Sequence, residues 1–189
     1  MATTMTPTDL SAIAQDLSTD IDGAFAAYVR ATADGIFTGA LRMLGDRSDA
    51  EDVMQETYAR AYNALAGYPP KRIEQLKVSG WTWTIAANLC RNRLRSRARK
   101  PTSPLGDADV AETGAGPDEE ALSHMSAVLQ AALLTLPFPQ RAAVVLRHVL
   151  DMTYDEVAWA LGRPVGTIKA DVHRGLARLR EIYPEEDAK

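Results

Sequence analysis

Apolar residues recur along the chain at three- and four-residue steps, and no stretch alternates apolar with polar residues at every second position. The first spacing places apolar side chains on one face of an α-helix, whereas a half-buried strand would show the second. The pattern therefore predicts an all-α protein. The expected helices cover residues 22–44, 48–65, 81–97, 119–134, 139–150, 154–161 and 165–182.

Residues with known preferences for helix ends mark several of these boundaries. Ser48 and Glu51 have the spacing of a capping box, which predicts that the second helix begins at Ser48. Gly45 favours the end of the helix before it. The prolines and glycines between Pro69 and Gly80 indicate a loop before the third helix.

A segment rich in proline, glycine and acid divides the predicted helices into two groups. Residues 101–120 hold six acidic and no basic residues. Such a segment buries too little apolar surface to offset the entropy lost on ordering, so it predicts a flexible linker. We expect two small helical domains, at residues 21–100 and 121–183. An N-terminal tail of residues 1–20 precedes them, and its packing stays open.

The charge of the chain is unevenly distributed. The 189 residues include 21 Lys and Arg and 25 Asp and Glu, a formal net charge of -4. This average argues against nucleic-acid binding, for which a domain pI above about 9 is typical. Residues 61–100, however, carry nine basic residues and one acidic residue. Because only the local field attracts phosphate, nucleic-acid binding by this part of the chain stays open.

Cysteine content and hydropathy limit the chemistry and the location of the protein. Cys90 is the only cysteine, which excludes an intramolecular disulfide and a thiolate zinc cluster. The first 20 residues lack the basic and apolar regions of a secretory signal, and no apolar run approaches the ~18 residues of a membrane span. We therefore expect a cytoplasmic protein without membrane insertion.

Six of the ten residues from Arg91 to Lys100 are basic, on a helix whose earlier turns carry apolar residues. One side of this helix carries polar residues at steps of four, three and four, namely Thr84, Asn88, Arg91 and Arg95. Hydroxyl, amide and guanidinium groups in such a row suit a phosphate backbone or exposed base edges.

Two aromatic residues are candidates for stacking on unpaired bases. Trp83 lies off the apolar stripe of Trp81, Ile85 and Leu89, and Tyr68 lies in the predicted loop before this stripe. The alternative is a solvated basic helix end, favoured by the helix dipole, with Trp81 and Trp83 in the core.

A carboxylate stripe lies on the second predicted helix, where Asp49, Asp52 and Glu56 are spaced by three and four with Gln55 beside them. A helical metal site would need Glu-x-x-His pairs, and no histidine precedes His124. The helix dipole favours acids in the first turn but does not account for Glu56, which lies beyond it. Both a docking face for a basic partner and a solvated helix start fit this spacing.

The last two predicted helices have the pattern of a helix-turn-helix, in which the second helix enters the major groove of DNA. Thr153 caps the first of them and Gly162 ends it. The outward positions of the second are predicted to be Thr167, Ala170, Asp171, Arg174 and Arg178. The candidate DNA contacts are Arg163, Thr167, Lys169, Ala170, His173, Arg174 and Arg178. A purely structural helical hairpin is the alternative.

Four motifs follow one another along the chain. They are Asp49-Ala-Glu-Asp-Val-Met-Gln-Glu-Thr-Tyr-Ala-Arg60, then Trp81-Thr-Trp-Thr-Ile-Ala-Ala-Asn88, then Leu136-Pro with Gln140-Arg, and finally Met152-Thr-Tyr-Asp-Glu-Val-Ala-Trp-Ala-Leu-Gly162 with Val165-Gly-Thr-Ile-Lys169. Together they resemble the extracytoplasmic-function (ECF) sigma factors of bacterial RNA polymerase, and the resemblance spans residues 22–182. It implies two helical domains, called regions 2 and 4, with no catalytic site and no cofactor.

The resemblance also implies partners and residue roles. The helix that docks on the clamp helices of the polymerase's largest subunit is matched by Asp49, Asp52, Gln55 and Glu56. Asn88 and the basic residues after it match the part that holds the melted minus-10 element, and the loop before Trp81 matches one that captures a flipped base. The helix-turn-helix matches the reader of the minus-35 element, in the domain that meets the flap of the second-largest subunit. Many relatives are held inactive by an anti-sigma factor.

Some positions depart from the family pattern. Ala170 and Asp171 stand where relatives commonly have Ser-Arg. An aspartate that faces DNA would repel phosphate, although it can accept a hydrogen bond from cytosine, so we expect an altered minus-35 preference. Ala87 and the loop from Gly67 to Gly80 also differ, which leaves the minus-10 sequence open.

Three other functions compete with this interpretation. A helix-turn-helix regulator that is not a polymerase subunit accounts for the last two helices, but not for the carboxylate stripe or the basic helix. An enzyme would use His124, His148 and His173, which lie on different predicted helices without metal-binding spacing. A protein adaptor would not bind DNA specifically.

Overall fold

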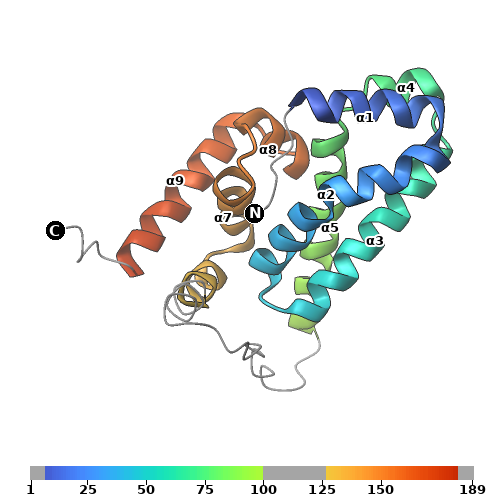
Figure 1. The fold of residues 1–189 in the computed structure, drawn as a ribbon. Coiled ribbons are helices and arrows are strands. Elements are labelled where there is room, and N and C mark those ends of the chain that lie inside the picture. Colours follow the sequence, from blue (N-terminus) through green and yellow to red (C-terminus); the bar gives the residue numbers. More distant parts are fainter. Residues whose placement is uncertain (1–6, 100–126, 183–189) are drawn as a thin grey trace, which may run out of the picture.

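The computed structural model describes residues 7–99 and 127–182, and these residues are helical with short connections and no strand (Figure 1). The first group of helices is α1 (Pro7–Thr19), α2 (Ile21–Leu44), α3 (Arg47–Ala66), α4 (Pro70–Glu74) and α5 (Val78–Arg99). The second group is a helix at 127–135, α7 (Phe138–Val144), the π-helix η1 (Val145–Val149), α8 (Tyr154–Leu161) and α9 (Val165–Ile182). The all-α prediction is confirmed. The predicted linker, Lys100, His124 and the start of the helix predicted at 119 lie outside the described residues.

Helices α2, α3 and α5 pack side by side, and α1 and α4 lie together across one end of them (Figure 1). Their shared core includes Tyr28 and Met43 of α2, Val53 of α3 and Cys90 of α5, all fully buried. Within the N-terminal 20 residues, α1 buries Leu17 against this group. The first predicted domain is therefore built around three long helices.

The start of α3 differs from the prediction. Asp46, not Ser48, is the N-cap, and its carboxylate accepts a hydrogen bond of 2.8 Å from the backbone N–H of Asp49. Asp is as strong a cap as Ser, so the earlier of two competent residues starts the helix. Glu51 instead forms an ion pair of 2.9 Å with Arg47. The predicted capping box is wrong, although the helix is present.

The predicted loop between the second and third helices is shorter than expected. Its first half forms α4, which begins at Pro70, and α5 already begins at Val78. Proline is favoured in the first turn of a helix because the N–H it lacks has no partner there, so Pro69-Pro70 marks a helix start as well as a turn. Gly80 consequently lies inside α5, where Trp159 approaches to 3.3 Å from the position that a Cβ atom would take.

The second group of helices is the predicted helix-turn-helix and its support. Thr153 and Glu156 form a capping box, in which the Thr153 hydroxyl accepts from the Glu156 N–H at 3.3 Å. Gly162 ends α8 with a φ of 62°, a left-handed conformation that glycine adopts without strain. The helix predicted at 139–150 consists of α7 and the wider turn η1.

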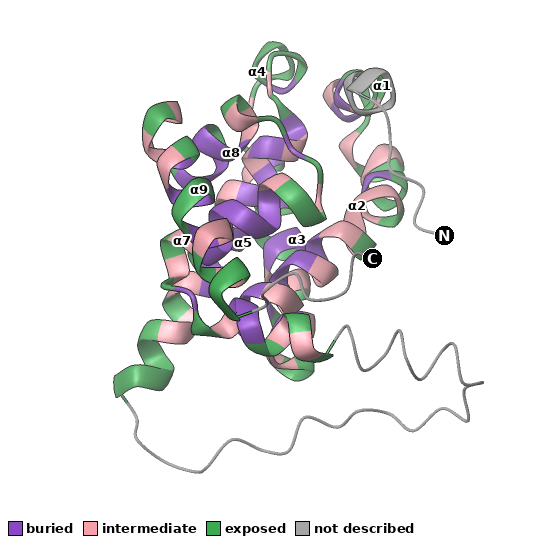
Figure 2. Cartoon of the chain, turned by 90° about the vertical axis from the view of Figure 1, so that its left-hand side faces the viewer, coloured by how far each residue is buried: buried purple, intermediate pink, exposed green. Residues whose placement is uncertain are grey.

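The two groups of helices share one continuous core (Figure 2). Helix α8 packs against α5, and η1 and α7 contact α2. Gly39 of α2 leaves room for Trp83 of α5 and for Leu150, whose Cδ1 would lie 2.9 Å from a Cβ atom at that position. Two units that are separated in the sequence by the predicted linker are thus packed together.

Candidate nucleic-acid and partner interface

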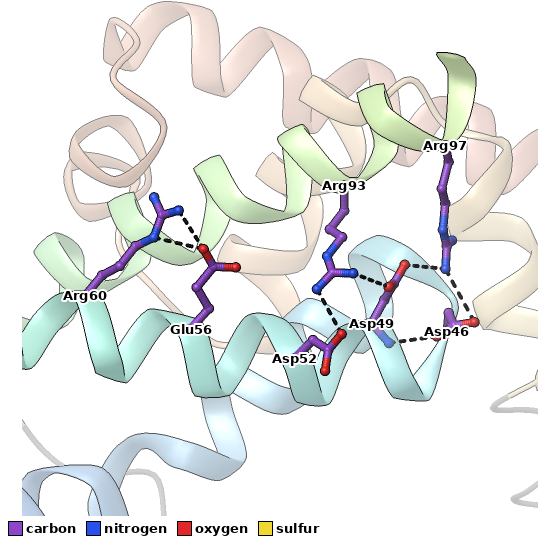
Figure 3. A network of polar contacts seen from close by, with 7 residues as sticks. All are labelled: Asp46, Asp49, Asp52, Glu56, Arg60, Arg93 and Arg97. Carbon is purple, nitrogen blue, oxygen red and sulfur yellow. Dashed lines mark hydrogen bonds and ion pairs between the residues drawn. The ribbon is translucent and has the colours of Figure 1, made fainter. Parts of the chain in front are cut away.

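The carboxylate stripe of α3 and the basic helix α5 meet in one ion-pair network (Figure 3). Arg93 donates to Asp49 Oδ1 at 3.1 Å and to Asp52 Oδ2 at 2.9 Å. Arg97 pairs with Asp49 and, at 3.3 Å, with Asp46. Two features that the sequence presented as separate sites therefore neutralise each other in part. The Asp49 side chain is only 15% exposed, which makes its role that of joining α3 to α5.

Three of the predicted polymerase-docking residues remain accessible on the outer side of α3. Asp52 and Gln55 are exposed, and Glu56 is partly exposed. Glu56 pairs with Arg60 one turn along, at 2.6 Å. Exposed pairs of this kind contribute about 0–1 kcal/mol, so a partner can replace them at little cost. The stripe is consequently divided into an inner residue, Asp49, and an outer face that is open to a partner.

The residues predicted to hold the minus-10 element lie along α5 and differ in exposure. Asn88 and Arg95 are exposed, whereas Thr84 and Arg91 are partly buried. Arg91 donates to Asn88 Oδ1 at 3.1 Å, and its guanidinium lies 5.9 Å from the ring centre of Phe138 in α7. Thr84 donates to the carbonyl oxygen of Gly80 at 3.1 Å, one turn back in the same helix.

A groove of about 610 Å³ brings the two predicted DNA-binding units together. Arg91 and Arg95 of α5 line one wall, and Phe138 of α7 and Arg163 of the α8–α9 turn line the other. No local sequence signal points to this groove, because its walls come from helices on either side of the predicted linker.

The prediction for Trp83 is wrong in this structure. Its side chain is 5% exposed and packs against Gly39, so it is part of the core and cannot stack on a base here. It shares the buried face of α5 with Ala86, Ala87 and Cys90, whereas Trp81 of the predicted stripe is only partly buried. The predicted apolar stripe therefore lies along the edge of the true core face, since its third residue, Leu89, is as buried as Trp83. Because most residues on the buried face of α5 are small, the apolar spacing does not show whether Trp81 or Trp83 is at its centre.

Tyr68 lies near the N-terminal end of α5, where it contacts Trp81. Its ring centre is 6.1 Å from that of Trp81, and the guanidinium of Arg72 lies 3.7 Å from it. These three side chains form a partly exposed aromatic and cationic cluster between α3 and α5.

Helix α9, the second helix of the helix-turn-helix, has a basic outer side. Lys169, His173, Arg174 and Arg178 are exposed, and Thr167 and Ala170 are partly exposed. Arg178 donates to Gln140 Oε1 at 3.2 Å. These residues lie on the side of α9 opposite the buried Ile168 and Val172. The predicted contacts are thus brought together on one surface.

Asp171 is the exception, and its predicted outward position is wrong. The residue is 3% exposed, and its carboxylate pairs with Arg163 and with Arg174. A carboxylate on the inner side of a helix is stable when both of its oxygens have cationic partners. The expectation that Asp171 repels DNA phosphate therefore falls away.

Burial also determines the chemistry of the titratable core residues. Desolvation raises the pKa of the Cys90 thiol to about 12, and that of Tyr58 to about 12 as well. Tyr58 shares a hydrogen bond of 2.8 Å with Thr32, and Tyr28 is hydrogen-bonded to Thr82.

His148 and His173 are exposed on different helices. Residues 7–99 and 127–182 hold no group of three or more His, Cys, Asp or Glu side chains that suits a metal ion.

Among the described residues, no helix is both long and apolar enough to cross a bilayer.

A helix-turn-helix whose second helix has a basic outer side, together with a second basic helix on the same chain, is typical of helical nucleic-acid-binding proteins. Family models agree with this class and narrow it. The model for sigma-70 region 2 matches residues 23–100, and the model for sigma-70 region 4 matches residues 126–179.

Curated relatives give the same result. The chain is 35% identical over 163 residues to the ECF RNA polymerase sigma factor SigE of Mycolicibacterium smegmatis, covering 85% of this chain and 62% of that protein. It is 34% identical over 171 residues to the ECF RNA polymerase sigma factor SigW of Bacillus subtilis, covering 84% of this chain and 88% of that protein. The chain belongs to the ECF sigma factors of the sigma-70 family.

Solved structures share the fold at lower identity. CnrH, in its complex with the cytosolic domain of CnrY, superposes with a TM-score of 0.69 at 20% identity, covering 94% of this chain and 99% of that one. The sigma factor RpoE of Bartonella quintana, in complex with the anti-sigma factor NepR, gives 0.65 at 21% identity, covering 86% and 98%.

Proposed function

We propose that this chain is the promoter-recognition subunit of RNA polymerase at a set of promoters, where it binds core enzyme and directs initiation. The observation that carries the proposal is the presence, on one sigma-70 chain, of an exposed basic side on α9 and a second polar and basic side on α5. In this role the chain recognises and opens DNA in the cytoplasm, and the polymerase performs the phosphodiester chemistry. A regulator that acts without polymerase would not use the outer face of α3.

Helix α9 is the proposed reader of the minus-35 element. Its exposed Arg174 carries a guanidinium that fits the O6 and N7 atoms of guanine or a phosphate. Lys169 and Arg178 supply charge for phosphates on either side of this residue. Part of the affinity then depends on salt, because each neutralised phosphate releases counterions.

Helix α5 is the proposed holder of the melted minus-10 element. Asn88 offers an amide to a base edge, and Arg91 and Arg95 lie one and two turns further on to meet the strand backbone. Tyr68 remains the aromatic candidate for stacking, since Trp83 is in the core. The partly exposed cluster of Tyr68, Trp81 and Arg72 lies next to this row.

The outer face of α3 is the proposed docking surface for the clamp helices of the largest polymerase subunit. Asp52, Gln55 and Glu56 form this face, while Asp49 holds α3 against α5 behind it. The second group of helices, at residues 127–182, would meet the flap of the second-largest polymerase subunit. An anti-sigma factor is a further candidate partner, as in the complex of RpoE with NepR.

The packed arrangement has to open for this function. Minus-10 and minus-35 elements are roughly 25 base pairs apart, which at about 3.4 Å per base pair is about 85 Å. A compact chain of this length has a radius of gyration of only about 16 Å. One packed body cannot reach both elements, so α5 and α8 must separate when the polymerase is bound.

Strand opening by the reconstituted holoenzyme tests the proposal. We expect thymines of a minus-10 element, in a promoter found by genomic selection, to become reactive to permanganate only when chain and core enzyme are both present. Asn88→Ala with Arg95→Ala should weaken this reactivity at least tenfold while polymerase binding persists. Equal opening by core enzyme alone would refute the proposed function.

A further inference from the structure

Asp171 holds two arginines of the helix-turn-helix with one carboxylate. Its Oδ1 accepts a hydrogen bond of 2.6 Å from Arg174, one turn further along α9. Its Oδ2 pairs with Arg163, which lies in the turn between α8 and α9. The Asp171 side chain is 4% exposed, whereas those of Arg163 and Arg174 are 34% and 55% exposed. The acid is thus inside and both guanidinium groups reach the surface.

This geometry restricts the two side chains that matter for recognition. A free arginine side chain samples many rotamers and loses them when it binds. Each oxygen of Asp171 engages a different guanidinium, which fixes one end of both arginines before any ligand arrives. A guanidinium has five N–H donors, so the arginines keep donors for a further partner after pairing with the acid.

The alternative role of Asp171 as a surface acid is excluded by its burial. An acid that faced DNA would repel phosphate, but this carboxylate lies behind the arginines and its charge is matched by two cations. The three residues carry one net positive charge on the outer side of the turn and the middle of α9. Lys169 and His173 lie exposed on the same helix.

We propose that Asp171 is a positioning residue of the DNA-reading surface, which holds Arg163 and Arg174 in the arrangement that distinguishes one base pair from another. The inference rests on the proposed minus-35 function of α9. It assigns to Asp171 a part in sequence preference without contact with DNA. It also gives the Ala170-Asp171 departure from the family pattern a physical role.

The test measures discrimination, which is the ratio of the affinity for the selected promoter duplex to the affinity for a duplex with one changed base pair. Full-length chain in holoenzyme is titrated, at fixed salt, with the selected promoter duplex and with duplexes that carry single base-pair changes in the minus-35 element. Arg174→Ala first identifies the base pairs whose discrimination depends on Arg174. Asp171→Asn keeps the size of the side chain and removes its charge. We expect it to reduce discrimination at the same base pairs at least fivefold, although removal of an acid favours DNA binding in general.

Asp155→Asn is the matched control. Asp155 is exposed on α8, so its replacement makes the same charge change in the same motif without touching the two arginines. We expect wild-type discrimination from it. At the base pairs that depend on Arg174, the double variant Asp171→Asn with Arg174→Ala should discriminate no worse than Arg174→Ala, because there the acid acts through that arginine.

The outcomes separate the inference from the proposed function. Wild-type discrimination in Asp171→Asn at the base pairs that depend on Arg174 would overturn the inference, whatever the melting temperature of the variant. If that variant does not fold, Asp171→Ser, which puts a smaller neutral side chain at the same position, tests the same point, and retained discrimination at those base pairs overturns it equally. Loss at those base pairs in either variant supports it. Absence of any minus-35 preference in the wild-type holoenzyme would instead contradict the function on which the inference rests.

Discussion

Arg141 of α7 donates a hydrogen bond of 2.6 Å from Nη1 to the carbonyl oxygen of Met43, near the end of α2. Its Nη2 donates to the carbonyl oxygens of Leu134 and Leu136 at 3.0 Å each. Burial lowers the pKa of this guanidinium, because desolvation disfavours the charged form. A buried cation thus joins the two groups of helices, and its replacement should change the free energy of unfolding.

Replacement of Arg141 should destabilise the packed chain. Arg141→Met removes the donor from three carbonyl oxygens, and a buried unpaired group costs on the order of 1 to 3 kcal/mol. We expect the free energy of unfolding in urea to fall by about 2 to 4 kcal/mol, since some of the groups find water. Arg147→Met is the control, because Arg147 pairs at 3.0 Å with the exposed Asp151, a contact worth about 0–1 kcal/mol. If the two changes lower the free energy of unfolding equally, Arg141 does not join the two groups of helices as described.

Asp49 and Asp52 should separate stability from partner binding. Asp49→Asn removes two ion pairs between α3 and α5 at a mostly buried residue, and we expect it to lower the free energy of unfolding by about 1 kcal/mol. Asp52→Lys together with Glu56→Lys changes the outer face, and between α3 and α5 it removes only the exposed pair of Asp52 with Arg93, a contact worth about 0–1 kcal/mol. We expect this double variant to keep its helical circular dichroism and to lose binding to core polymerase at least tenfold.

Titration of labelled core enzyme with each purified variant measures this binding. Asp49→Asn should bind core within a factor of about three of the wild-type chain. Full binding by the doubly reversed variant would show that the outer face of α3 is not the docking surface.

The two helical units should move apart when polymerase binds. Dyes on cysteines introduced at Ala59 of α3 and Arg180 of α9, both exposed, report the distance between the units. The native Cys90 does not compete for thiol dyes, because it is fully buried and its pKa is raised to about 12. We expect energy transfer to be high in the free chain and to fall on addition of core enzyme.

A pair within one unit is the control for the dyes. Thr19 and Ala59 are exposed and both belong to the first group of helices, so their energy transfer should not change. An unchanged signal from the Ala59–Arg180 pair in the holoenzyme would contradict the opening step.

Stability should fall in alkaline solution. The Cys90 thiol has a pKa of about 12 in the folded chain, against 9.0 as its ordinary value. The folded state therefore retains the proton over a range in which the unfolded chain releases it, and stability present below pH 9 is lost as the pH rises toward 12. One such group changes the free energy of unfolding by at most about 1.4 kcal/mol per pH unit.

Cys90→Ala isolates this contribution. Between pH 8 and pH 10 the variant should lose less stability than the wild-type chain in urea unfolding, because it has no thiol to ionise. Parallel curves for the two proteins would show that Cys90 does not titrate with unfolding. Tyr58, whose pKa is also about 12 in the fold, contributes above pH 10 in both.

Local signals in the sequence predicted the long helices and the helix-turn-helix, but not α1 or α4. The ends at Gly45 and Gly162 and the cap at Thr153 are where the sequence indicates, because each depends on residues within four positions. The cap at Ser48 failed because Asp46, two residues earlier, is an equally good acceptor. The π-helix η1 could not be predicted, because the apolar spacing of residues 145–149 is that of an ordinary α-helix.

Side-chain orientation was harder to predict where the partner is distant. Trp83 is in the core because Gly39 of another helix makes room for it. Asp171 turns inward because Arg163, eight residues earlier, meets it in the folded turn. The contact of Arg141 with Met43 spans 98 positions, and no periodicity within one helix encodes it. Lys169, His173, Arg174 and Arg178 of α9 are exposed as the pattern of this helix predicts, and their contact with DNA stays a prediction.

Transcription in a purified system tests the central claim most directly. Core enzyme and this chain are combined on a promoter obtained by genomic selection, and run-off RNA is measured with and without the chain. We predict RNA that starts at one position, requires the chain, and disappears with the doubly reversed Asp52→Lys, Glu56→Lys variant. If the wild-type chain binds the promoter but the pair initiates no RNA above core enzyme alone, the chain is not a sigma factor in function.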